Sequence, residues 1–137
     1  MTKMFSTIIL SGLAMIPVAY AQSSQPIQTK VPFAFTVQNT NLPAGSYQLT
    51  YSNTAHTLWI RGLDSNLKGA FVTASPADAS EASGTSGKLV FDCYGKSCYL
   101  AQVWHGGATR GLKVRQSGPQ RVLSFSMRTV TVTIPAK

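Results

Sequence analysis

The sequence predicts an all-β protein, a small antiparallel β-sandwich or barrel of about seven or eight strands that follows a cleaved signal peptide. Apolar side chains alternate with polar ones along several short stretches, which is the period of a β-strand. Turn residues separate these stretches at intervals of roughly 8 to 12 residues. No apolar repeat of helical period continues for three turns. Together these observations favour strands throughout the mature chain.

Residues 1–21 have the pattern of a secretory signal peptide. Lys3 precedes an apolar run at residues 5–18, and a small-x-small tripeptide at residues 19–21 follows the run. The run is short for a bilayer span, and a glycine and a proline interrupt it, so a retained transmembrane helix is the weaker interpretation. We expect cleavage after the tripeptide and a secreted or periplasmic mature protein that has no integral membrane span.

Residues 22–137 are expected to form a single β-rich domain with a basic surface. Without the signal peptide the chain has eleven Lys and Arg residues against four Asp and Glu residues, a formal charge of +7. A surplus of this size favours anionic neighbours such as acidic polysaccharide or other envelope material. The basic residues are scattered singly, so nucleic acid is not an expected partner.

The N-terminal half of the domain predicts four strands. They are expected at residues 27–37, 47–51, 57–61 and 69–74. Pro32 lacks the N–H group that a sheet ladder needs, so the first strand is predicted to lie at an edge or to contain a bulge. Residues 39–45 have the composition of a turn, and this turn predicts that the first two strands pair in the manner of a hairpin.

The C-terminal half begins after a flexible Ser/Ala/Gly-rich loop predicted at about residues 75–87. Strands are expected at residues 88–94, 98–104 and 112–115 and in a long final stretch. The apolar residues of that stretch form two sets of opposite parity, which are Leu123, Phe125 and Met127, and then Val130, Val132 and Ile134. A bulge or turn near Arg128 would bring both sets to the core side of one strand.

Cys93 and Cys98 are predicted to form a structural disulfide. They flank a two-residue turn at Gly95-Lys96, and this hairpin register places them opposite each other at a non-hydrogen-bonded position, where strands approach most closely. An oxidising compartment favours the bond. Four residues separate the cysteines and no second cysteine pair exists, so neither a redox motif nor a zinc site is expected.

The acidic residues do not form a recognisable catalytic pair, and we expect a protein that is not an enzyme. Asp78 and Glu81 fall in the predicted flexible loop, where a fixed catalytic geometry is not expected. Only Asp64 and Asp92 would remain to act as the two carboxylates of a glycosidase. The two histidines stand alone in the sequence. We identify no catalytic residue, cofactor site or metal site.

Aromatic residues on the predicted strands are the candidates for a ligand face. The four residues that we single out are Trp59, Trp104, Tyr47 and Tyr51. Flat aromatic rings stack on the apolar faces of pyranose sugars, but core packing uses the same residues. If Leu58 and Ile60 point inward, then Trp59 points outward, whereas the opposite register would place Trp59 in the core.

Several short motifs occur in a fixed order between residues 31 and 104. They are Val31-Pro32-Phe33-Ala34-Phe35-Thr36-Val37, Leu42-Pro43-Ala44-Gly45-Ser46-Tyr47, Leu89-Val90-Phe91, Tyr94-Gly95 and Leu100-Ala101-Gln102-Val103-Trp104. In this order they resemble a family of small secreted bacterial proteins, common in Acidobacteria, with a PFxF strand, an LPAGxY turn and a later LVFxxYG...LxQVW hairpin. The resemblance implies export and a β-rich domain but no particular activity. The cysteine pair and the C-terminal strand from Val122 to Ile134 depart from the family pattern.

The leading hypothesis from the sequence is an exported, non-enzymatic β-domain that binds envelope or extracellular polysaccharide. The signal peptide, the basic surplus and the aromatic-rich strands motivate it. The alternative is a structural or protein-interaction module of the cell envelope that assembles through an exposed edge strand. A hydrolase is the third hypothesis. The sequence leaves the ligand, the oligomeric state and the choice between periplasm and extracellular medium open.

Overall fold

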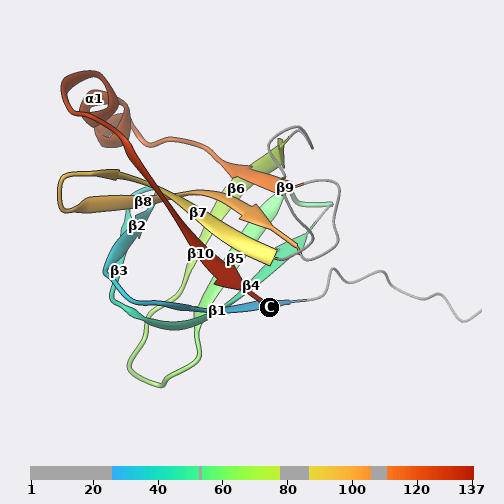
Figure 1. Ribbon diagram of the computed structural model, residues 1–137. Coiled ribbons are helices and arrows are strands. Elements are labelled where there is room, and N and C mark those ends of the chain that lie inside the picture. The colour runs from blue at the N-terminus through green and yellow to red at the C-terminus, as the bar shows by residue number, and fades with distance from the viewer. Residues whose placement is uncertain (1–25, 53, 78–86, 106–110) are drawn as a thin grey trace, which may run out of the picture.

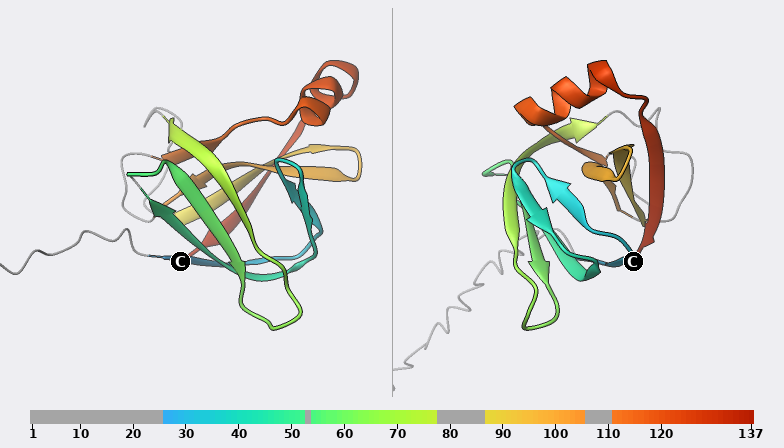
Figure 2. Two further views of the ribbon diagram at one scale, coloured as in Figure 1. Left: turned by 180° about the vertical axis from the view of Figure 1, so that it is seen from behind. Right: turned by 90° about the vertical axis from the view of Figure 1, so that its left-hand side faces the viewer.

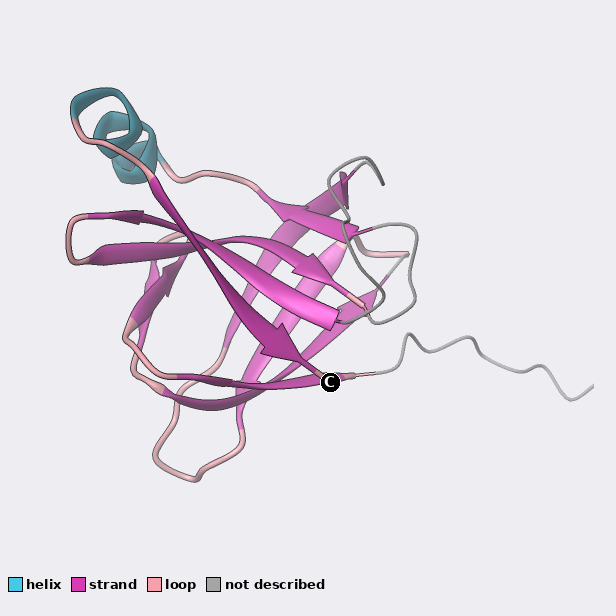
Figure 3. Cartoon of the chain, viewed as in Figure 1, coloured by secondary structure: helices cyan, strands magenta, loops and turns pink. Residues whose placement is uncertain are grey.

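The computed structural model describes residues 26–52, 54–77, 87–105 and 111–137 (Figure 1). Strands account for 62% of the described residues and the structure has ten strands and one short helix, so the predicted all-β class is confirmed, with more strands than the seven or eight expected (Figure 3). The predicted signal peptide and most of the predicted Ser/Ala/Gly-rich loop lie outside the described residues.

The elements follow the order of the chain. The strands are β1 (Ile27–Val31), β2 (Phe35–Val37), β3 (Thr40–Leu42), β4 (Gly45–Ser52), β5 (Thr57–Gly62), β6 (Ala70–Ala77), β7 (Gly87–Tyr94), β8 (Ser97–Trp104), β9 (Gly111–Val114) and β10 (Val130–Ala136). The helix α1 (Gly118–Ser126) lies between β9 and β10. The expected strands at residues 57–61, 69–74, 88–94, 98–104 and 112–115 therefore match β5 to β9 within a few residues.

Eight of the ten strands form the wall of a barrel, in the order β1, β4, β5, β6, β9, β8, β7 and β10, and every pair along this path is antiparallel. The ring closes where Gln28 and Lys137 exchange two backbone hydrogen bonds of 2.8 and 2.9 Å. The hydroxyl of Thr29 also donates to the carbonyl of Pro135 at 3.1 Å. Viewed from the side, the strands are arranged as a ring (Figure 2). The sequence predicts either a sandwich or a barrel, and the structure is a barrel.

Alternation fills the barrel with apolar side chains, because each strand turns every second residue inward. Phe35 lies at the centre of an aromatic cluster, with ring centroids 5.2 Å from Tyr47 and 5.4 Å from Phe91 in edge-to-face arrangements. Phe33 extends the cluster through Phe91 at 5.1 Å. Burying each such ring stabilises the fold by about 1.5 to 3 kcal/mol. The described residues inside the barrel thus form a packed core.

The first predicted strand is divided in two at Pro32. β1 ends at Val31 and β2 begins at Phe35, because the proline has no N–H group to continue the ladder. β2 pairs in antiparallel fashion with β3, which occupies part of the predicted turn at residues 39–45. β2 also pairs in parallel with β8. The predicted pairing of the first two long strands is confirmed, since β1 runs antiparallel to β4.

The prediction that a bulge or turn near Arg128 brings both apolar sets of the final stretch to the core is wrong for the first set. Residues 118–126 form α1, and Phe125 and Met127 are exposed. Ser117 caps the helix by accepting a hydrogen bond from the backbone N–H of Gln120 at 3.3 Å, and Pro119 occupies the first turn. The helix has nine residues, so its apolar repeat is too short to be recognised over three turns. In β10, Val132 and Ile134 pack against the core as expected, whereas Val130 is exposed.

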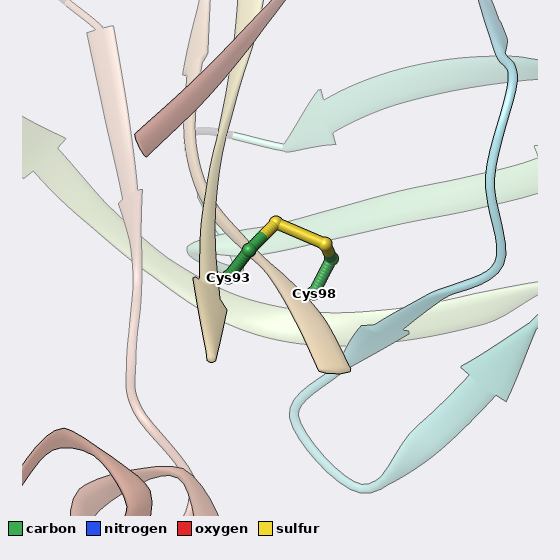
Figure 4. Close-up of a disulfide and its surroundings, with 2 residues drawn as sticks. All are labelled: Cys93 and Cys98. Atoms are coloured by element: carbon green, nitrogen blue, oxygen red, sulfur yellow. A yellow bond between two sulfur atoms is a disulfide. The ribbon is translucent and has the colours of Figure 1, made fainter. Parts of the chain in front are cut away.

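The predicted disulfide is confirmed at the β7–β8 hairpin (Figure 4). Cys93 and Cys98 lie directly opposite each other in the antiparallel register, as the two-residue turn requires. Gly95 adopts φ +62° in that turn, a conformation that glycine reaches without strain. The cross-link therefore fixes the register of the strands that carry Asp92 and Gln102.

Candidate functional site

Two large aromatic side chains lie exposed next to each other on the outer face of the barrel. Leu58, Ile60 and Val72 point into the core, so the intervening positions on β5 and β6 point outward. Trp59 is 54% exposed and Phe71 is 68% exposed. They are directly opposed in the antiparallel register, with ring centroids 5.3 Å apart and ring planes at 32°. The two rings thus form one broad apolar surface.

Polar side chains from β4 and β5 border this surface. Gln48 and Arg61 are opposed across the two strands, and the guanidinium of Arg61 donates to Oε1 of Gln48 at 3.0 Å. Thr50 lies opposite Trp59. The hollow that these side chains border has a volume of about 530 Å³ and is lined by Gln48, Thr50, Trp59, Ile60, Arg61, Gly69, Ala70 and Phe71. We call the group formed by Trp59, Phe71, Gln48, Thr50 and Arg61 the aromatic platform.

The platform suits a neutral ring that has one apolar face and polar edges. A pyranose can stack on the two aromatic rings while its hydroxyl groups reach the amide of Gln48, the hydroxyl of Thr50 and the guanidinium of Arg61. The hydrogen bond between Gln48 and Arg61 links these two polar side chains at the edge of the platform. None of the residues that line the platform carries a carboxylate, an imidazole or a thiol.

The other three residues of the expected ligand face do not join Trp59. Tyr47 has the parity of Leu49 and is fully buried inside the barrel, where its hydroxyl donates to the carbonyl of Pro43. Burial raises the pKa of the Tyr47 hydroxyl above its ordinary value. Tyr51 is half-buried and its hydroxyl lies 3.3 Å from Nδ1 of His56. Of the four residues singled out from the sequence, Trp59 is therefore the one that is largely exposed.

Trp104 lies on the outside of the barrel wall but is covered, and only 2% of it is exposed. Its cross-strand neighbour on β9 is Gly111, and a Cβ added there would lie 2.5 Å from the indole ring. The ring therefore occupies the space that a side chain at position 111 would take. The ammonium of Lys88 lies 5.8 Å from the ring centroid, and the indole N–H donates to Oε1 of Gln102 at 2.9 Å.

Sequence reasoning missed Phe71, which forms half of the platform. A signal was present, because Val72 and Ala74 are alternate apolar residues of β6 and their parity turns Phe71 outward. Recognising it also required the pairing of β5 with β6, which places Phe71 beside Trp59. Without that register, an isolated phenylalanine on a short strand has no distinctive meaning.

The remaining candidate residues stay apart from the platform. Asp64 is exposed in the turn after β5, and Asp92 is half-buried on β7.

Within the described ranges, no group of three or more His, Cys, Asp or Glu residues could hold a metal ion. In the same part of the chain, no helix is long and apolar enough to cross a membrane. Comparison with known protein families, curated proteins and solved structures gave no match.

Proposed function

We propose that this protein is an exported, non-enzymatic domain that binds envelope or extracellular polysaccharide through the aromatic platform. The observation that carries the proposal is the directly opposed pair of Trp59 and Phe71, both more than half exposed on neighbouring strands. The predicted signal peptide and the disulfide, which is compatible with an oxidising compartment, support a location outside the cytoplasm.

The cost of exposing these two rings favours a binding role over chance exposure. Full burial of a large apolar side chain stabilises a fold by about 1.5 to 3 kcal/mol. Trp59 and Phe71 are both more than half exposed, so neither contributes the full amount. Contiguous exposed apolar surface rimmed by polar groups is typical of ligand and partner sites. The barrel already has a complete core, so the two rings are not needed to fill it.

The platform is also rigid in the way that a weakly binding sugar site requires. Both rings stand on strands that are paired on both sides, β5 between β4 and β6, and β6 between β5 and β9. Each ring has only two side-chain torsions to restrict, so little conformational entropy is lost when a ligand stacks on it. Preorganisation of this kind converts a small contact area into usable affinity.

Co-sedimentation with insoluble polysaccharides across a salt series tests the proposal. We expect the oxidised protein to be retained by at least one neutral polysaccharide at high salt, because stacking is screened little by ions. Trp59→Ala and Phe71→Ala should each weaken retention by about tenfold or more. Phe125→Ala is the matched control, since Phe125 is 91% exposed but lies on α1, away from the platform.

The outcomes separate the proposal from charge attraction. Retention that disappears on adding salt and is unaffected by Trp59→Ala would reduce the interaction to the basic surface and contradict the proposal. Equal losses in Phe71→Ala and Phe125→Ala would likewise show that the platform is not the binding surface.

A protein-interaction module is the second candidate, and the exposed apolar group around α1 favours it. Val122 is 66% exposed, Phe125 91%, Met127 44% and Val130 54%. Val122 and Phe125 lie on α1, Met127 directly follows the helix, and Val130 begins β10. The group lies beside the β7–β8 turn, since a Cβ at Gly95 would lie 3.2 Å from Met127 (Figure 1). Analytical ultracentrifugation tests it, because self-association that is lost in Phe125→Ala and retained in Phe71→Ala would assign this surface to assembly.

A further inference from the structure

A second hollow lies on the outer surface next to the aromatic platform, and its chemistry is different. It has a volume of about 660 Å³ and forms where β6, β9, β8 and β7 meet the chain that leads into α1. Its polar lining consists of Thr73, Ser75, Asp92, Gln102, Lys113, Arg115, Gln116, Gln120 and Arg121. We call it the cationic hollow.

The strand register aligns the polar groups of the hollow in a row. Lys113 on β9 is opposed to Ser75 on β6 and to Gln102 on β8. All three have the parity that points away from the core, because their neighbours Ala74, Val114 and Val103 are buried inside the barrel. An ammonium group therefore stands between a hydroxyl and an amide on a continuous sheet.

The charge of the hollow is strongly unbalanced. Lys113, Arg115 and Arg121 supply three positive charges, and Asp92 supplies the one negative charge among the lining residues. Burial raises the pKa of Asp92, and the nearby Lys113 lowers it by less. The charged residues of the lining therefore sum to a formal charge of +2. Anions are attracted to such a concave surface more strongly than to a convex one.

Neighbouring contacts hold the lining in place. The indole N–H of Trp104 donates to Oε1 of Gln102, so the amide of Gln102 is oriented by a buried ring. Gln120 is only 3% exposed and contributes to the hollow from the first turn of α1. The backbone N–H of Gln120 is already bonded to the Ser117 hydroxyl, so the attraction for an anion comes from side chains rather than from the helix end.

The platform and the hollow are joined along one strand. Phe71, Thr73 and Ser75 are alternate residues of β6 and point outward together. The four residue steps from Phe71 to Ser75 span about 13 Å, because a strand rises about 3.3 Å per residue. Phe71 belongs to the platform, whereas Thr73 and Ser75 line the hollow. A chain molecule of this length can occupy both surfaces at once.

We propose that the cationic hollow binds an oxyanion carried by a saccharide, so that the ligand of the domain is an acidic polysaccharide. Lys113, Arg115 and Arg121 would contact the carboxylate, sulfate or phosphate group, because charge-assisted hydrogen bonds to such groups are strong. Amide and hydroxyl groups of the lining would bind sugar hydroxyls. This inference rests on the proposed function only in that the aromatic platform would hold the neutral part of the polysaccharide. The hollow is a separate site and has its own test.

Isothermal titration of the exported, oxidised protein with two forms of one polymer provides that test. Polygalacturonate carries carboxylates, its fully methyl-esterified form is neutral, and inorganic phosphate serves as a small anion. We expect polygalacturonate to bind at least about tenfold more tightly than the ester. The double variant Lys113→Gln, Arg121→Gln should remove this difference. Lys30→Gln removes one positive charge on β1. It should leave the preference for polygalacturonate unchanged, because β1 contributes no residue to the hollow.

Each outcome decides one of the two proposals. An unchanged preference for polygalacturonate in the double variant, or an equal loss in Lys30→Gln, would overturn the hollow as the anion site. Phosphate binding without polygalacturonate binding would overturn the assignment to a saccharide. If the ester never binds but polygalacturonate binds through Lys113 and Arg121, the platform proposal fails and the hollow stands. Thermal unfolding of each variant confirms that it is folded.

Discussion

The two tryptophans of this chain stand on the same outer wall of one barrel, and their surroundings are opposite. Trp59 faces Phe71 across the strand pair and is 54% exposed, whereas Trp104 faces Gly111 and is 2% exposed. The Phe71 ring lies beside the first ring on the surface. Gly111 leaves room for the second ring, because a Cβ there would lie 2.5 Å from the indole, and the ammonium of Lys88 lies 5.8 Å from the ring centroid. The cross-strand neighbour thus decides whether an outward tryptophan becomes a binding surface or part of the packing.

The same contrast separates the two surfaces that we assign to a ligand. The platform on β4, β5 and β6 offers two exposed rings and one cation that is bonded to Gln48. The hollow on β6, β9, β8 and β7 offers three cations and no exposed aromatic ring. Binding at the first should depend little on salt, and binding at the second should weaken steeply with it. A ligand that uses both would show both behaviours in separate variants.

The largest expected effect is a difference in stability between the two tryptophans. Trp104→Ala should lower the free energy of unfolding by about 3 to 5 kcal/mol, because it leaves a cavity over Gly111 and releases the amide of Gln102. Trp59→Ala should change it by less than about 1 kcal/mol, because the ring is exposed. Urea unfolding followed by circular dichroism measures both. Similar losses in the two variants would show that Trp59 is a packing residue.

Removal of the disulfide should have the next largest effect and should act on one surface only. The double variant Cys93→Ala, Cys98→Ala is expected to lose about 2 kcal/mol of stability, because the bridge closes only a short loop. The β7–β8 hairpin carries Asp92 and Gln102, so anion binding should weaken while neutral polysaccharide binding is retained. Titration of the variant with both ligands checks this. Parallel loss of both would show that the two surfaces do not depend on separate strands.

The smallest expected effect is on the pH dependence of the hollow. Because burial raises the pKa of Asp92, the folded protein holds this proton more tightly than the unfolded chain. Asp92 therefore favours folding most below its ordinary pKa of 3.8, and the contribution is lost as the pH rises through the higher folded-state value. Protonation also adds one positive charge to a hollow that contains Lys113, Arg115 and Arg121.

Binding of dextran sulfate, whose sulfate groups stay ionised, should consequently tighten modestly as the pH falls toward 4, a direction that the hollow's charge requires. Asp92→Asn should flatten this dependence, and Asp64→Asn, which removes an exposed acid outside the hollow, should not. The platform is lined by no Asp, Glu or His residue, so binding there should change little over this pH range. An equal response of the two variants would attribute the pH dependence to total charge.

Much of the fold follows from alternation and turn chemistry. The β7–β8 hairpin could be predicted down to the Cys93–Cys98 bridge, because a two-residue turn fixes the register of its strands. The helix α1 could not, since nine residues are too few to establish a period and Leu123, Phe125 and Met127 also alternate as in a strand. Closure of the ring depends on the contact of Gln28 with Lys137, which no local pattern indicates.

The candidate site was predictable only in part for a related reason. Parity could place Trp59 outward once Leu58 and Ile60 were assigned to the core. Parity could not show that Tyr47 lies inside the barrel or that the Trp104 ring occupies the space beside Gly111, because both depend on which strands pair. Residues of the hollow come from four strands and a helix, so only the assembled sheet brings their charges together.

Acrylamide quenching of tryptophan fluorescence, with and without a saturating neutral polysaccharide, tests whether a bound polysaccharide covers Trp59. The chain has two tryptophans, and Trp104 is buried, so quencher-accessible emission comes from Trp59. We expect the polysaccharide to protect this emission, and Trp59→Phe to leave only the inaccessible component. Accessible emission that is unchanged by a polysaccharide shown to bind the protein would contradict the assignment of the aromatic platform as the ligand face.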